Sequence, residues 1–336
     1  MIKRSLGIIT RIALAAICLA AAFKLSSATP HNLIFGNALG CAALVAGWVL
    51  NQIFCAWRLQ ILMRVLQIRI PYLVMLRITF SAFVAASVMP GLIAGDVAKV
   101  VLLKIDSRDV GLADLTLIAL IDRALGMLCL WFLSVFLSFI IEVPDTGQAR
   151  GLILIVQAGF FVLCAAAILV MHVLRRKREA DIWWLPRMPA RVSSFFRATI
   201  RLARDDRALA QIFLRATPIS FVAVILLVST QAGVGSLMMS ELGEPQRILL
   251  QTFLAPTSIV VSSLPIAPSG IGVGQLTLAT TYAIMQLPSE VAIALTSVVQ
   301  ISQILVAVVA AGLLALLPLG WQMPRGSASK VDSEQV

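Results

Sequence analysis

Two stretches rich in proline and glycine interrupt otherwise apolar runs, and they constrain the fold more than any other feature. The earlier stretch, Val88–Lys99, reads VMPGLIAGDVAK, and the later one, Leu264–Gln275, reads LPIAPSGIGVGQ. Proline removes a backbone hydrogen-bond donor and glycine permits sharp turns, so each stretch is expected to break a helix. Broken backbone at membrane depth is tolerated only where protein buries it or where it lines a wet cavity. Such breaks in both halves of a membrane chain point to a binding or transport site.

The composition places the chain in a membrane. Of the 336 residues, 60% are hydrophobic and 13% are charged, whereas a soluble domain is closer to half apolar and a quarter charged. Apolar runs long enough to cross a bilayer occupy residues 3–23, 34–55, 114–141, 152–173, 217–239 and 291–317. The first run follows a basic start and precedes small residues, so a secretory signal peptide is the alternative to a transmembrane helix there. The second run is expected to end at Trp57 and Arg58, an interfacial aromatic residue and a cation.

Two further pairs of apolar runs are too short for a comfortable crossing. They comprise residues 78–89 with 92–103, and residues 248–264 with 276–285. A helix that enters the membrane, turns at a break and returns to the same side fits these lengths. The sequence therefore predicts two re-entrant helical hairpins, with structural breaks at Pro90, Pro265 and Pro268.

The positive charges predict the orientation of the spans. Most of them, 23 of the 27 Lys and Arg residues, lie in residues 1–11, 57–110, 174–216 and 324–336. Cytoplasmic segments collect such residues, so both termini are expected in the cytoplasm. Each half of the chain then reads span, span, hairpin, span, and an odd number of full spans turns the second half upside down. The predicted fold is an all-α polytopic membrane protein with six transmembrane helices plus two re-entrant helical hairpins in an inverted repeat, which is typical of transporters.

This repeat divides the chain into a first membrane repeat, residues 1–150, a second membrane repeat, residues 151–323, and a cytoplasmic tail, residues 324–336. The second repeat contains a basic cytoplasmic loop, residues 174–216. Arginines of the segment 187–207 share one face of an expected amphipathic helix, which favours contact with an anionic leaflet. These arginines are Arg197, Arg201 and Arg204. The positive-inside bias already explains the net charge of +11, so nucleic acid is not expected as a partner.

Ionisable residues near the first break are candidates for a substrate site. Asp96 and Lys99 are three residues apart and share a helical face, and Asp96 lies near a helix start, where the dipole favours a carboxylate. Arg123 lies about 18 Å along its span, near mid-bilayer, where an arginine costs at least about 2.5 kcal/mol. Its neighbour Asp122 points about 100° away, so Arg123 needs another partner. Asp96 or a ligand phosphate would serve, and a purely structural ion pair with Asp96 is the alternative to a binding role.

Backbone groups at the two breaks complete the predicted substrate site. Half-helix N-termini near Gly91 and Gly270 would offer donors and dipole ends to a phosphate. The substrate-binding candidates at the breaks are Gly91, Gly95, Ser269, Gly270, Gly272 and Gln275. The spacings of Gly91 with Gly95 and of Gly270 with Gly274 also match GxxxG, and that motif alone favours close helix packing instead.

No sequence pattern for a cofactor, metal or nucleotide site is present. The five cysteines form no CxxC pair, and the two histidines form no HExxH motif. Neither break is a GxxxxGK[ST] P-loop. We therefore expect no cofactor, no metal and no nucleotide as a fuel.

Three motifs resemble the flippase-like integral membrane family related to the N-terminal membrane domain of lysylphosphatidylglycerol synthase, a family that includes a hopanoid-associated branch. They are PGLIAGDVAK, IDRALGMLCLWF and LPIAPSGIGVGQ, in this order. The resemblance covers nearly the whole chain and implies lipid translocation or lipid handling in a bacterial inner membrane. By position it assigns family motif roles to Pro90, Gly95, Asp96, Arg123, Pro265, Gly270 and Gly272. The family often has Gly-Gly and then a Glu after the second break, where this chain has Ser269 and Gln275. That substitution removes the carboxylate from which an ion-coupling or headgroup role would be inferred.

These features together predict a lipid transporter rather than an enzyme. A flippase would move an anionic lipid, of phospholipid or polyprenyl type, through a midplane cavity between the two hairpins. The alternative is a membrane subunit or enzyme of lipid modification, associated with an aminoacyl- or glycosyl-transferase, but the longest cytoplasmic loop is too short for a catalytic domain. A scaffold for a lipid-pathway complex is a third reading. The sequence leaves open whether the chain forms homo-oligomers or associates with lipid-pathway enzymes, and which lipid it handles.

Overall fold

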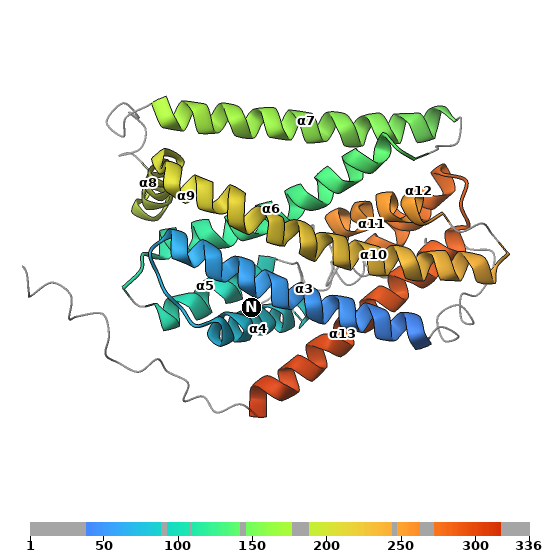
Figure 1. Cartoon of the computed structure of the whole chain (residues 1–336), viewed down its shortest axis with the longest axis horizontal. Helices are drawn as coiled ribbons and strands as arrows, with labels where there is room; N and C mark the ends of the chain where they lie inside the picture. Colours follow the sequence, from blue (N-terminus) through green and yellow to red (C-terminus); the bar gives the residue numbers. More distant parts are fainter. Residues whose placement is uncertain are drawn as a thin grey trace, which may run out of the picture.

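Long helices build the molecule, as the computed structural model shows, and α13 (Ser289–Leu316) crosses α3 (Ala38–Val65) obliquely (Figure 1). The structure describes residues 38–88, 93–107, 109–141, 146–176, 188–243, 247–262 and 272–316. Within these ranges every regular element is a helix. The prediction of an all-α chain is therefore confirmed for the part that the structure describes.

Five helices of the described chain are long and apolar enough to cross a membrane. They are α3 (Ala38–Val65), α6 (Leu112–Ser138), α7 (Gly147–Arg176), α10 (Thr217–Glu241) and α13 (Ser289–Leu316). At 1.5 Å per residue, each is longer than the hydrocarbon core of about 30 Å. The chain is therefore a multi-pass membrane protein. The first predicted span, residues 3–23, lies outside the described residues.

Two pairs of shorter helices occupy the places of the predicted hairpins. The first pair is α4 (Tyr72–Val88) with α5 (Ile93–Asp106), and the second pair is α11 (Ile248–Ser262) with α12 (Val273–Ile284). The members of each pair pack against each other, and the two pairs lie toward opposite ends of the long helices (Figure 1). The breaks that join them lie outside the described residues, and so do the predicted site residues Pro90, Gly91, Pro265, Pro268, Ser269 and Gly270.

Several helix ends differ from the predicted boundaries, among them the start of α4 at Tyr72 instead of residue 78. Helix α3 continues past Trp57 and Arg58 to Val65, so the predicted end of the second span was wrong. The basic loop predicted over 174–216 is shorter, because α9 (Asp206–Gln211) and a π-helical turn η3 (Ile212–Ala216) lead directly into α10. The Asp205 side chain caps α9 by accepting a hydrogen bond from the Ala208 N–H at 3.0 Å, which satisfies one of the free donors of a helix start and favours beginning the helix there.

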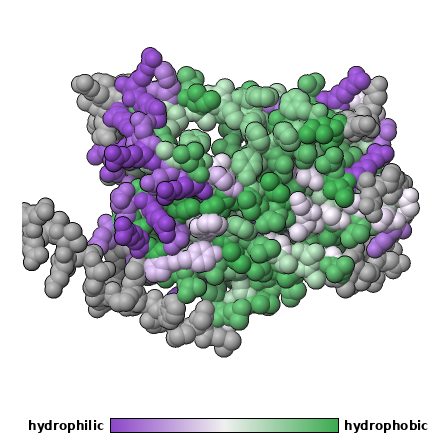
Figure 2. Space-filling model, viewed as in Figure 1, coloured by the Kyte–Doolittle hydropathy of each residue, from purple (hydrophilic) through white to green (hydrophobic). Residues whose placement is uncertain are grey.

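Hydrophobic side chains form a broad band across the middle of the molecule, and hydrophilic side chains gather at its two ends (Figure 2). The band coincides with the long helices, as expected for surfaces that face lipid. Helix α10 lies centrally and packs against α3, α6, α11 and α13. Helix α7 lies at the edge of the described part. Its main neighbours there are α6 and α8 (Ala190–Arg204), and most of its side chains face outward. The core that positions polar groups is therefore built around α10.

Helix α8 matches the amphipathic helix expected in the segment 187–207. The side chains of Ala198, Ile200 and Ala203 are buried. The three predicted arginines, Arg197, Arg201 and Arg204, are exposed. The prediction of one arginine-bearing face is confirmed, and contact of that face with an anionic leaflet stays a prediction.

Candidate functional site

Five charged side chains meet where α3, α5 and α6 come together. At the centre, the Asp122 carboxylate on α6 accepts hydrogen bonds from Arg58 Nε of α3 at 2.5 Å and from Lys99 Nζ of α5 at 2.8 Å. The Asp122 side chain is 2% exposed, and the Arg58 side chain is 6% exposed. Because an isolated buried charge is strongly unfavourable, this carboxylate depends on its two cationic partners.

A second ion pair lies beside the first. Arg123 Nη1 donates to Asp96 Oδ2 at 2.7 Å, and these two side chains are about one-fifth exposed. Asp96 and Lys99, one helical turn apart on α5, therefore contact the neighbouring residues Arg123 and Asp122 on α6. This confirms the predicted shared face on α5, the position of Asp96 in the first turn, and the argument that Asp122 and Arg123 cannot neutralise each other. The structural ion pair of Arg123 with Asp96 is present, and a ligand-binding role for either residue stays a prediction.

Arg58 is the member of this cluster that the sequence interpretation missed. Its guanidinium also donates to Ser220 Oγ on α10 at 3.2 Å. Gly126 on α6 lies against it, and a Cβ there would be in van der Waals contact with Arg58 Nη1 at 3.4 Å. A tryptophan and an arginine after an apolar run are typical of a membrane interface, and this explains the error. The available signal was Asp122 itself, since a second buried charge that points away from Arg123 needs a cation of its own.

The five named side chains carry three positive and two negative charges, which sum to one positive unit. An ion pair repays the loss of hydration only when its charges are well matched. An anionic group brought to this cluster would balance the remaining charge. The pair of Arg123 and Asp96 is the more exposed part of the cluster.

The described candidates of the second break lie apart from this cluster, on α12 at the other end of the molecule (Figure 1). Gln275 is 2% exposed. Its Oε1 accepts from the Gly272 N–H at 2.7 Å, and its Nε2 donates to Gln300 Oε1 on α13 at 2.6 Å. Gly272 has φ +81°, a conformation that glycine adopts without strain. Gln275 thus connects the start of α12 to α13 with uncharged hydrogen bonds.

Gly95 lies in a close contact between α5 and α4. A Cβ at this position would be 2.9 Å from the backbone oxygen of Ala82. This agrees with the packing interpretation of the GxxxG spacing for Gly95, while its predicted role in substrate binding is not tested by this contact.

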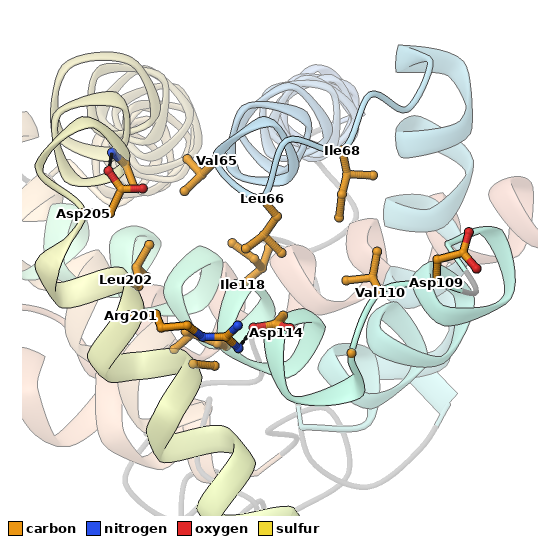
Figure 3. A pocket seen from close by; sticks show the side chains of 14 residues that line it. Val65, Leu66, Ile68, Asp109, Val110, Asp114, Ile118, Arg201, Leu202 and Asp205 are labelled. Carbon is orange, nitrogen blue, oxygen red and sulfur yellow. Dashed lines mark hydrogen bonds and ion pairs between the residues drawn. The ribbon is translucent and has the colours of Figure 1, made fainter. Parts of the chain in front are cut away.

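A separate polar pocket of about 390 Å³ lies at one end of the molecule, between the ends of α3, α6 and α8 (Figure 3). Arg201 of α8 reaches across it to Asp114 of α6, with 3.2 Å between Nη2 and Oδ1. Asp109 and Asp205 also line it. The arginine of this pair is mostly exposed and the aspartate partly so, and a pair in contact with solvent contributes little to stability. Among the described residues, no three potential metal-ligating side chains come together, here or elsewhere.

Comparison with known proteins places the chain in a family. No curated protein and no solved structure matched it. A model of a protein family, described as the lysylphosphatidylglycerol synthase TM region, matches residues 5–312, which is most of the chain. This match agrees with the resemblance carried by the motifs around Asp96, Arg123 and Gly272. The chain therefore belongs to the lysylphosphatidylglycerol synthase TM region family, whose members are membrane proteins linked to lipid handling.

Proposed function

We propose that this chain is a flippase that moves an anionic lipid, of phospholipid or polyprenyl type, across a bacterial inner membrane. The observation that carries the proposal is the net positive cluster of Arg58, Lys99, Arg123, Asp96 and Asp122 beside the first pair of short helices. Family membership supports a role in lipid handling. In this proposal both termini lie in the cytoplasm, where the positive-inside rule puts them.

The chemical task of a flippase is to lower the free-energy penalty of bringing a polar headgroup into hydrocarbon. A phosphate near Arg123 would exchange its hydration for a charge-assisted hydrogen bond. Asp96 occupies Arg123 in the absence of lipid, at 2.7 Å, and so keeps the cation neutralised until an anion displaces it. Lys99 and Arg58 remain paired with the buried Asp122, and these ion pairs hold α3, α5 and α6 in position.

In the proposed architecture the two short-helix pairs are re-entrant hairpins that enter from opposite faces of the membrane. Their lengths support this, because the longest of the four helices has 17 residues, or about 26 Å, less than the hydrocarbon thickness. Their places toward opposite ends of the long helices also support it (Figure 1). An inverted repeat of this kind allows one half to rock against the other around a fixed site.

Exchange of a lipid between leaflets tests the proposal. The full chain is reconstituted into liposomes that contain an anionic phospholipid with a fluorescent acyl chain, and dithionite is added outside to bleach the accessible probe. We expect bleaching of the inner-leaflet probe with the wild type, and strong slowing with Arg123→Gln and with Asp96→Asn. Arg215→Gln is the matched control, because Arg215 is an exposed arginine of η3 outside the cluster. Equal bleaching rates in wild type, both cluster variants and empty liposomes would contradict the proposal.

A second candidate function is a membrane subunit of a lipid-modifying enzyme. The family description, which names a synthase of lysylphosphatidylglycerol, favours it. Here the same cluster would hold an anionic lipid while a partner enzyme transfers an aminoacyl or glycosyl group to it. The two functions differ in their products: a flippase leaves the lipid chemically unchanged, whereas modification changes its mass, which mass spectrometry of the extracted lipids detects.

A further inference from the structure

A cavity lined by uncharged amide side chains lies inside the bundle, between α3, α10, α11, α12 and α13. Its volume is about 290 Å³, near the lower end of the range of small-ligand pockets. The amide residues that line it are Asn51, Gln52, Gln231, Gln251, Gln300 and Gln303. No charged residue lines it among the described residues. Arg58 of the ionic cluster lies six residues, or about 9 Å, further along α3 than Gln52.

Amide groups in the interior of a membrane protein are unfavourable unless they are hydrogen-bonded. Part of this set is satisfied within the protein, since Tyr282 donates to Gln251 and Gln275 donates to Gln300. Another part is not. The side-chain nitrogen of Gln231 and the indole nitrogen of Trp48 are buried and lack a hydrogen-bond partner in the described part of the chain. Gln231 as a whole is 3% exposed. Both residues line the cavity.

Two donors of the described residues at this cavity, Trp48 Nε1 and Gln231 Nε2, therefore lack acceptors. A carboxamide both donates and accepts hydrogen bonds and has no charge, so its best complement is a group that also does both. Hydroxyl groups do so and bring no charge into a lining whose described residues carry none, whereas a phosphate would bring a full charge. Trp48 and Phe83 add apolar ring surface to the same wall, with ring centroids 5.7 Å apart. An uncharged group with several hydroxyls, such as a sugar or a polyol, satisfies this lining best.

We propose that this amide cavity binds the uncharged, hydroxyl-bearing part of a lipid headgroup, a sugar or polyol. The inference rests on the proposed function and specifies it further, because the ionic cluster would take the anionic part of the lipid and the cavity its hydroxyl-bearing part. Leu227, Leu278 and Leu295 complete the wall with apolar surface, which suits a headgroup that remains attached to hydrocarbon. The substrate class is then an anionic lipid whose headgroup also carries a sugar or polyol.

Binding to the purified full chain tests this. The protein is kept in a polyoxyethylene detergent, since maltoside and glucoside detergents carry sugars themselves. Three probes of matched acyl chains are titrated: a monoglucosyl diacylglycerol, a diacylglycerol and phosphatidic acid. Tryptophan fluorescence reports occupancy of the cavity, and Trp48→Phe identifies the part of the signal that comes from Trp48. We expect the glucosyl lipid to change the Trp48 signal at the lowest concentration of the three.

Substitution of the unsatisfied amide sharpens the test. We expect Gln231→Leu to weaken glucosyl-lipid binding about tenfold, the factor for loss of one hydrogen bond between uncharged groups, and to leave phosphatidic acid binding unchanged. The same variant should fold with an equal or higher melting temperature, because it removes a buried donor that has no partner. Gln157→Leu is the control, since Gln157 lies on α7 outside the cavity and donates to Ser138 Oγ at 2.8 Å.

Several results would overturn the inference. Equal affinity for all three lipids, or unchanged glucosyl-lipid binding in Gln231→Leu, would show that the cavity does not recognise hydroxyl groups by hydrogen bonding. Free glucose that competes as well as the glucosyl lipid shows a soluble sugar site instead of a lipid headgroup site. If anionic phospholipid still exchanges between leaflets while the glucosyl lipid does not bind, the inference alone fails. If neither occurs, the proposed function fails as well.

Discussion

The two pairs of short helices occupy corresponding places in the chain, yet they contribute different chemistry. The first pair, α4 with α5, presents charged side chains, and Asp96 and Lys99 form ion pairs with α6. The second pair, α11 with α12, presents amides, and Gln275 hydrogen-bonds to Gln300 on α13. Both arrangements give buried polar groups a partner and so lower the free-energy cost of burying them. The comparison teaches that two pairs of short helices in one membrane chain can bury polar groups in different ways, one with ion pairs and one with amide hydrogen bonds.

The two solutions differ in how strongly they depend on each partner. A buried carboxylate without a cation carries its full desolvation penalty. Removal of one member of an ionic cluster is therefore expected to cause a large loss of stability. An amide that loses one neighbour forfeits a single hydrogen bond and remains uncharged. The ionic pair of helices should therefore be the more sensitive of the two to substitution.

The largest effect is expected at Asp122. Asp122→Ala leaves Arg58 and Lys99 without their shared carboxylate, and removal of one partner of a buried ion pair costs about 3–5 kcal/mol. The free energy of unfolding, measured by denaturant titration in mild detergent, checks this. Asp114→Ala serves as the control, because Arg201, the partner of Asp114, is mostly exposed. Similar losses in both variants would remove the distinction between buried and exposed ion pairs.

An intermediate effect is expected at Gln275. Gln275→Glu introduces a carboxylate at the start of α12 and removes the N–H that Gln300 accepts. We expect a loss of about 1–3 kcal/mol, the range for a buried polar group left without its partner. Thermal unfolding of the purified variant measures it. A variant as stable as the wild type would show that this pair of helices tolerates charge, and that the contrast between the two pairs is weaker than proposed.

Gly95 tests the packing of the first pair. In Gly95→Ala the new Cβ would lie 2.9 Å from the Ala82 backbone oxygen, so α4 and α5 must separate, at a cost of about 1–3 kcal/mol. The matched substitution is Gly233→Ala in the middle of α10, where nothing lies within 4 Å of the added Cβ. There alanine should stabilise by about 0.5–1 kcal/mol, because it favours the helix. Melting temperatures that move in the same direction in both variants would contradict the close contact.

The smallest effect is expected outside both pairs. Arg201→Gln removes an ion pair at the pocket of Figure 3 whose arginine side chain is 66% exposed. Exposed pairs contribute at most about 1 kcal/mol and are screened by salt. The difference in unfolding free energy between variant and wild type should be below that value and should shrink as salt is added. A larger and salt-independent loss would mean that this pair is structurally as important as the buried ones.

Much of the architecture could be predicted because its signals are local. Hydrophobic length identifies a helix that crosses the membrane, and the described helices α3, α6, α7, α10 and α13 agree with five predicted spans. Two pairs of short helices occupy the places of the predicted hairpins, whereas the predicted breaks at Pro90, Pro265 and Pro268 lie outside the described residues. Helix geometry also predicted that Asp122 and Arg123 need different partners, and each has a different one. Arg58 was misplaced because nothing local distinguishes an interfacial arginine from a buried one.

By itself, the sequence determined that the chain lies in a membrane, that it is helical, and which residues carry charge inside it. These properties follow from residues that are close in the sequence, because helix periodicity and the length of an apolar run can both be recognised within one segment. Only the tertiary structure decided which charges pair, and that amides from Asn51 to Gln303 surround one cavity. The physical reason is distance along the chain: Arg58 and Asp122 are separated by 64 residues, and contacts between separate helices follow from packing that no local pattern encodes.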